Sequence, residues 1–205
     1  AFDAAVARSR HSHFSVVRLP RRNDAASRIT HEVLPGLWAR PPPAGASAAR
    51  STVALIPPCL PAVAASRLGL TNAHLDSDGV IRRFTAGEAL ADGSLLQSLP
   101  LSVLRALQPA DWEARVATLD RRAAPGLVAW RIAEEPYPHV PFADVFERAE
   151  GAVPAPPVPD LAGRIVVVGA TAPTLHDAHP TAVSARHQGV DTLATLIDNE
   201  LHRRH

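Results

Sequence analysis

A run of four β-branched residues, Ile165-Val166-Val167-Val168, constrains the fold of this chain more than any other stretch. It follows a polar turn at residues 160–164 and ends at Gly169, where a loop of small residues begins. A short β-branched run without polar alternation is typical of a strand that is buried on both faces, as in a parallel sheet covered by helices. The sequence therefore predicts a buried strand over residues 165–168 and a binding loop directly after it.

Length and composition favour a single domain with a sizeable core, because the chain has 205 residues of which 46% are hydrophobic. The net charge of +1 provides no general basic field, so we expect no nucleic-acid partner. The single cysteine, Cys59, excludes a disulfide within the chain. The longest apolar stretch, residues 52–66, contains three prolines and is too short to cross a bilayer.

Short strands alternate with helical patterns along the chain. We predict strands over residues 14–19, 53–56, 69–75, 80–85 and 126–132. We predict helices near residues 2–10, 61–67, 99–108, 112–119, 142–146 and 190–202. Residues 21–50 lack periodicity and predict a long loop, in which Pro41-Pro42-Pro43 favours an extended conformation. The expected fold class is mixed α/β, with a mixed, largely buried sheet flanked by helices and long proline-rich loops.

Two segments of the sequence resemble the CHASE2 family. Residues 161–177, LAGRIVVVGATAPTLHD, resemble its C-terminal signature, and Thr181 and Gly189-Val190-Asp191 continue it. Residues 68–72, LGLTN, followed by DSDGVIRR at residues 76–83, resemble an upstream segment of the same family. Thr181-Ala182 stands where the family has Thr-Pro, and Leu193-Ala194 stands where it has His-Ala, so no role of that histidine is carried over.

The resemblance implies a non-catalytic sensor domain without a cofactor, on the periplasmic or extracellular face of a bacterial membrane. Its partners would be a small molecule or an extracytoplasmic protein, flanking transmembrane helices and, as one possible assembly, a second copy in a homodimer. The output would be a cytoplasmic histidine kinase, Ser/Thr kinase or nucleotide cyclase. We expect residues 1–205 to form one domain that resembles the later part of the family's domain and lacks its N-terminal segment.

The loop after residues 165–168 is the first candidate ligand site. Thr171 and Thr174 offer hydroxyls, and backbone N–H groups after a buried strand can hold an anion. The alternative, a tight turn that needs small residues, is favoured, because no phosphate-binding glycine motif is present. We expect Thr171, Asp177 and Thr181 to order this turn, so that Asp177→Ala lowers stability by about 1–3 kcal/mol.

A second candidate site combines Asp76 and Asp78 with Arg82 and Arg83. Two carboxylates beside two guanidinium groups could bind a small polar ligand or a calcium ion. The alternative is a β-turn held by ion pairs, which the Asp-Ser-Asp-Gly composition favours.

The histidines near Asp177 suggest a different class of function. His176, His179 and His187 with Asp177 carry ligand types that Zn²⁺ prefers, although their spacing matches no standard zinc motif. The alternative function is therefore a small α/β metal-dependent hydrolase that uses His176, Asp177 and His179. Solvated loop histidines are the favoured interpretation, and we expect no bound metal.

A third class of function is an assembly module. The proline-rich residues 40–45 could dock on a partner as an extended segment.

Overall fold

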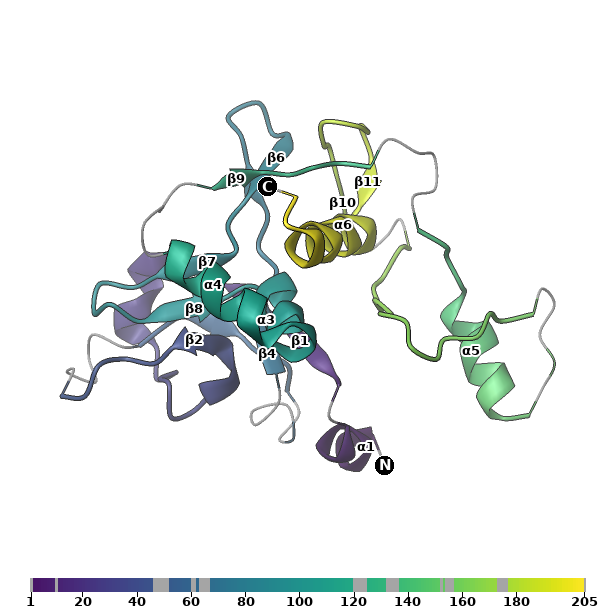
Figure 1. Ribbon diagram of the computed structural model, residues 1–205, viewed down its shortest axis with the longest axis horizontal. Helices are drawn as coiled ribbons and strands as arrows, with labels where there is room; N and C mark the ends of the chain where they lie inside the picture. The colour runs from purple at the N-terminus through teal and green to yellow at the C-terminus, as the bar shows by residue number, and fades with distance from the viewer. Residues whose placement is uncertain are drawn as a thin grey trace.

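The computed structural model describes residues 2–9, 11–45, 52–59, 62, 67–119, 125–131, 137–151, 153, 157–172 and 177–204. These residues form a mixed α/β fold, as the sequence predicts, in which the strands are divided among small sheets (Figure 1). The predicted helix at residues 61–67 lies mostly outside the described residues, and Ala62 is helical.

Two three-stranded sheets surround the core. The first has the order β3-β1-β4, with β3 (Leu55–Ile56) antiparallel and β4 (Arg67–Leu70) parallel to β1 (His13–Arg18). The second is antiparallel and has the order β2-β8-β7, with β2 (Trp38–Arg40), β8 (Leu95–Gln97) and β7 (Gly87–Ala89). The largest cluster of buried apolar residues includes Val16, Leu37, Leu68 and Leu96, which belong to or border these two sheets.

The remaining strands form two further sheets. One has the order β5-β6-β9 and contains β5 (His74–Leu75), β6 (Ile81–Phe84) and β9 (Gly126–Leu127). The other pairs β10 (Ala178–His179) with β11 (His187–Gln188). The antiparallel β5–β6 pair confirms the hairpin predicted around residues 76–79, and Gly79 has the positive φ that the turn requires.

The helices pack outside the sheets. They are α1 (Phe2–Arg8), α3 (Leu99–Leu107), α4 (Pro109–Leu119), α5 (Phe142–Ala149) and α6 (Gly189–His202), with the 3₁₀ helices η1 (Arg21–Ala26) and η2 (Pro35–Leu37). α3 begins at Leu99, as predicted from Pro100, and the Oγ of Ser98 caps it by accepting a hydrogen bond from the Leu101 N–H. α3 contacts β1, β4, α4 and α6, whereas α5 lies apart from the sheets in Figure 1.

The predicted strand at residues 165–168 is wrong. These residues belong to no strand, and Ile165, Val166 and Val168 are 48%, 53% and 75% exposed. The parallel pairing that the apolar run suggested is made instead by β1 and β4, and β1 has β3 on its other side. A β-branched run favours an extended chain but does not specify which strand it pairs with.

Three other predictions of strands and loops need correction. The long loop predicted at residues 21–50 contains η1, η2 and β2. The strand predicted over residues 69–75 is divided between β4 and β5, and the one predicted over residues 126–132 is limited to β9. The side chains of Ile81 and Leu95–Gln97 are buried, which explains why β6 and β8 are stable although they are short.

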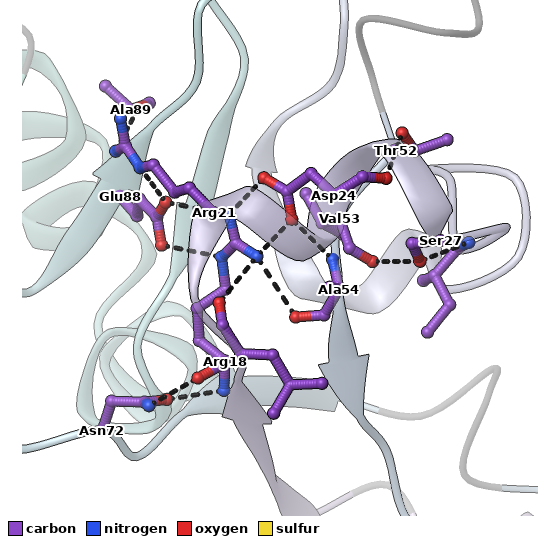
Figure 2. Close-up of polar contacts among 12 residues, drawn as sticks. Arg18, Arg21, Asp24, Ser27, Thr52, Val53, Ala54, Asn72, Glu88 and Ala89 are labelled. Carbon is purple, nitrogen blue, oxygen red and sulfur yellow. Dashed lines mark hydrogen bonds and ion pairs between the residues drawn. The ribbon is translucent and has the colours of Figure 1, made fainter.

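The side chain of Arg18 connects four segments of the core, as Figure 2 shows. Its guanidinium group is 7% exposed and donates to both carboxylate oxygens of Asp24, at 2.6 and 2.7 Å, and to both oxygens of Glu88, at 3.0 and 3.2 Å. Asp24 also accepts from the backbone N–H of Ala54, and Asn72 pairs with the backbone of Arg18 through both its side-chain atoms. This network ties β1 to η1, β7 and the segments around Ala54 and Asn72.

The inner face of α6 carries buried polar groups as well as apolar ones. Glu200 is 4% exposed and forms two hydrogen bonds with Arg115 of α4. The Asn199 side chain accepts from the N–H of Ala129 at 2.8 Å and donates to its carbonyl at 3.1 Å. Leu196 and Ile197 are buried as predicted for this helix. α6 is therefore held in one register by specific hydrogen bonds in addition to apolar packing.

We expect acid to weaken the fold through His13. Burial, followed by the charges of Arg67 and His11, lowers the pKa of His13 to about 4, and its Nδ1 lies 2.9 Å from Ser102 Oγ. Between pH 6.5 and 4 the unfolded chain binds more protons at this position than the folded one, so stability should fall across this range by about 1–3 kcal/mol. Urea unfolding at pH 7 and pH 4.5 measures this change. His13→Gln should flatten the pH dependence, and an equal dependence in both proteins would contradict the role of His13.

Candidate functional site

A cavity of about 260 Å³ lies beside the first turns of α6. Ser15 of β1, Thr71 and Ala73 after β4, and three residues of β6 form one side of it. Residues 167–169, Asp177, His179 and α6 form the other side. The cavity thus lies where five segments that are distant in sequence meet the start of one long helix.

Two glycines allow α6 to approach its neighbours closely at this point. A Cβ atom on Gly189 would lie 2.2–2.5 Å from the carboxylate of Asp177, and one on Gly169 would lie 2.8 Å from the Cβ of Val190. The N–H of Gly189 donates to the carbonyl of Asp177 at 2.8 Å. The positions of Asp177 and of the first turn of α6 are therefore coupled.

The cavity brings together two of the predicted ligand-site residues, Arg83 and Asp177, with His179 of the predicted histidine cluster. Thr181 lies next to them, because its backbone forms a parallel bridge with Ile81. Thr171 is exposed, and neither it nor Asp78 and Arg82 is among the residues that line the cavity. One residue of each predicted site therefore lies at the cavity.

Thr181 orders a separate turn at residues 181–184, and residues 173–176 of the loop that Thr171, Asp177 and Thr181 were expected to order lie outside the described residues. The Oγ1 of Thr181 accepts from the N–H groups of Val183 and Ser184. Asp177 contributes its backbone carbonyl, and its side chain is 45% exposed. The premise that Asp177 is a buried partner is wrong, so we expect Asp177→Ala to cost less than about 1 kcal/mol.

The second predicted site is a turn held by ion pairs. Asp78 forms a two-point contact with Arg82 at 2.8 and 2.9 Å, and Asp76 accepts from both Arg82 and Arg83. Hydrogen bonds from Arg82 lower the pKa of Asp78 to about 2. Because these carboxylates are already engaged by guanidinium groups, the structure favours the ion-paired turn over a calcium site.

The histidine cluster is divided in the structure. His179 and His187 are opposite each other in the β10–β11 pair, while His176 lies outside the described residues. His179 Nε2 is 3.8 Å from Asp177 Oδ1. His187 packs edge-on against Trp130, and burial lowers its pKa. Within the described part of the chain, no group of three or more histidine, cysteine or acidic side chains has the arrangement of a metal site.

Sequence reasoning missed Thr192, which is 6% exposed and lines the cavity. Its Oγ1 has no hydrogen-bond partner among the described residues. The sequence did signal that this segment of α6 faces inward, through the spacing of Leu193, Leu196 and Ile197, but this pattern does not show whether a hydroxyl finds a partner.

The described residues form a mixed α/β domain with a cavity against its C-terminal helix. The family model of the CHASE2 domain matches residues 2–205, and the chain belongs to this family. CHASE2 domains are extracytoplasmic sensory domains, and membership of this family supports a sensing role for the chain. A comparison with curated proteins and one with solved structures found no match. Among the described helices, none has the length and apolarity needed to cross a bilayer.

Proposed function

We propose that this chain is the sensing domain of a bacterial membrane-anchored receptor, and that α6 carries the signal from the cavity toward a cytoplasmic kinase or nucleotide cyclase. The observation that carries the proposal is the position of the cavity, whose wall includes Gly189, Val190 and Thr192 of the first turn of α6. A ligand bound there contacts the helix directly.

The contacts of α6 support a role in transmission. The helix runs from the cavity to Arg203, which ends it in a left-handed conformation. Arg115, Ala129 and α3 hold the rest of the helix. A ligand that prefers one position of the first turn would therefore change the angle at which the helix packs, with the contacts to Arg115 and Ala129 as its anchors.

The membrane anchor is tested by the coding sequence on both sides of this chain. An apolar span of about 20 residues near each end is expected for a receptor of this kind. Soluble flanking sequences on both sides would contradict membrane anchoring.

The signalling role is tested by filling the cavity in the intact receptor. Ala73 lines the cavity, and Ala73→Phe should change the kinase or cyclase output about fivefold or more, as is typical for coupling between two sites. Ala91→Phe is the matched control, because Ala91 is exposed and lies outside the cavity. Equal output from both variants, with both domains folded by circular dichroism, would contradict transmission from this cavity.

A further inference from the structure

The chemistry of the cavity wall limits the kind of ligand that it accepts, and this inference rests on the proposed function. One part of the wall is apolar and is formed by side chains from three segments. They are Ile81, Phe84, Val167, Val168, Leu193 and Leu196. Such a surface favours a hydrocarbon group, because apolar area is removed from water when the group enters.

The carboxylate of Asp177 lies on the polar side of the cavity without a close partner. No hydrogen bond to its side chain is present among the described residues, and its Oδ1 lies 3.8 Å from His179 Nε2. That distance is beyond the range of a hydrogen bond. Gly189 leaves the space in which this carboxylate sits against α6. Asp177 therefore offers a negative charge with unused acceptor capacity.

The positive charge of Arg83 is not available in the same way. Its Nε and one Nη atom both donate to Asp76 Oδ1, at 3.0 and 2.5 Å. The ion pair with Asp76 neutralises Arg83. The charge that remains without an ion pair of this kind at the cavity wall is therefore that of Asp177. The wall thus favours a cationic head group over an anionic one.

We propose that the cavity binds a small primary alkylammonium compound. The ammonium group donates hydrogen bonds to the Asp177 carboxylate, and the alkyl chain packs among the apolar side chains of β6, residues 167–168 and α6. The volume of about 260 Å³ lies below the range of about 300–1,000 Å³ that suits drug-sized ligands, so the ligand is a small one.

Isothermal titration of the 205-residue chain with three probes of equal chain length tests this assignment. The probes are hexylammonium chloride, 1-hexanol and sodium hexanoate, all at pH 7. Hexylammonium should bind at least tenfold more tightly than the other two. Asp177→Asn should weaken its binding about 10- to 100-fold, as for the loss of a charge-assisted hydrogen bond.

Asp160→Asn is the matched control, because Asp160 is exposed and lies outside the cavity. It removes the same charge and should leave binding unchanged. Equal or tighter binding of hexanol or hexanoate, absence of binding by hexylammonium, or equal binding by the Asp177→Asn variant would overturn the assignment. The Ala73→Phe experiment in the intact receptor separates a wrong ligand class from a wrong sensing cavity. A change of output in that variant without hexylammonium binding would retain the sensing cavity and reject only this class of ligand.

Discussion

Replacing Arg18 with methionine should lower the free energy of unfolding by about 3–5 kcal/mol. The substitution keeps an unbranched side chain in the core but removes the guanidinium group. Asp24 and Glu88, whose side chains are 24% and 19% exposed, then lose the cation that neutralises them. The backbone carbonyl of Ala54 also loses one of its two donors, the Arg18 guanidinium group seen in Figure 2, and keeps the N–H of Leu19. Urea unfolding at pH 7 measures the change.

Arg21 provides the matched control for Arg18. It also binds Glu88, at 2.9 Å, but its side chain is 68% exposed. Arg21→Met should therefore cost less than about 1 kcal/mol, since exposed ion pairs contribute little. Equal losses from the two variants would mean that the burial of Arg18 is not what makes it important.

The same network should also be sensitive to acid. Burial on its own raises the pKa of Asp24, but the hydrogen bonds from Arg18 and from the N–H of Ala54 lower it overall. A lowered pKa in the folded state means that the stabilisation is complete above the ordinary pKa of aspartate and is lost as the pH falls through the lowered value. In the Arg18→Met variant this part of the acid sensitivity should decrease.

The substitution Gly69→Ala should lower stability by about 3 kcal/mol or more. A Cβ atom at this position of β4 would lie 2.3 Å from the backbone N and Cα of Leu99 and 2.5 Å from the backbone C of Ser98. These atoms belong to the N-terminus of α3, so they can give way only if the helix moves. Overpacking in a core commonly costs about 1–3 kcal/mol of stability. We expect a loss at the upper end of this range, because the added Cβ meets backbone atoms, which cannot move aside as the end of a side chain can.

Gly93→Ala separates the steric effect from the general effect of adding a methyl group. Gly93 has φ +85° and no heavy atom within 4 Å of the added Cβ, so only the conformational cost of about 1 kcal/mol is expected. Thermal unfolding of the two variants under the same conditions compares them. A Gly69→Ala protein as stable as the Gly93→Ala protein would show that α3 is not in close contact with β4.

Local patterns predicted the parts of the fold that depend on neighbouring residues. The β5–β6 hairpin follows from the turn composition at residues 76–79, and the start of α3 follows from Pro100. The sheet of β2, β7 and β8 was missed because Leu95 and Leu96 extend the leucine pattern of the following helix, and pairing with Trp38 cannot be seen in that pattern. Residues 165–168 show the same limit, since apolar character does not identify a partner strand.

The candidate site shows a similar division. Arg83 and Asp177 were predicted from local patterns: Arg83 belongs to a cluster with Asp76 and Asp78, and Asp177 ends the loop after residues 165–168. Thr192 was not, because its significance lies in a missing hydrogen bond, which depends on the packing of segments far apart in the chain. Local sequence patterns also do not show which residues the packing brings to the cavity. For this reason Thr171, Asp78 and Arg82 were predicted as site residues although they do not line it.

The hydrogen bonds on the inner face of α6 restrict how this helix can move. A shift of one turn along its axis, about 5.4 Å, would separate Glu200 from Arg115 and Asn199 from Ala129 at the same time. Both pairs lie near the C-terminal end of the helix, whereas the cavity lies at its start. A piston-like displacement is therefore disfavoured, and the motion that these anchors permit is a pivot, in which the start of α6 swings while its C-terminal turns act as the hinge.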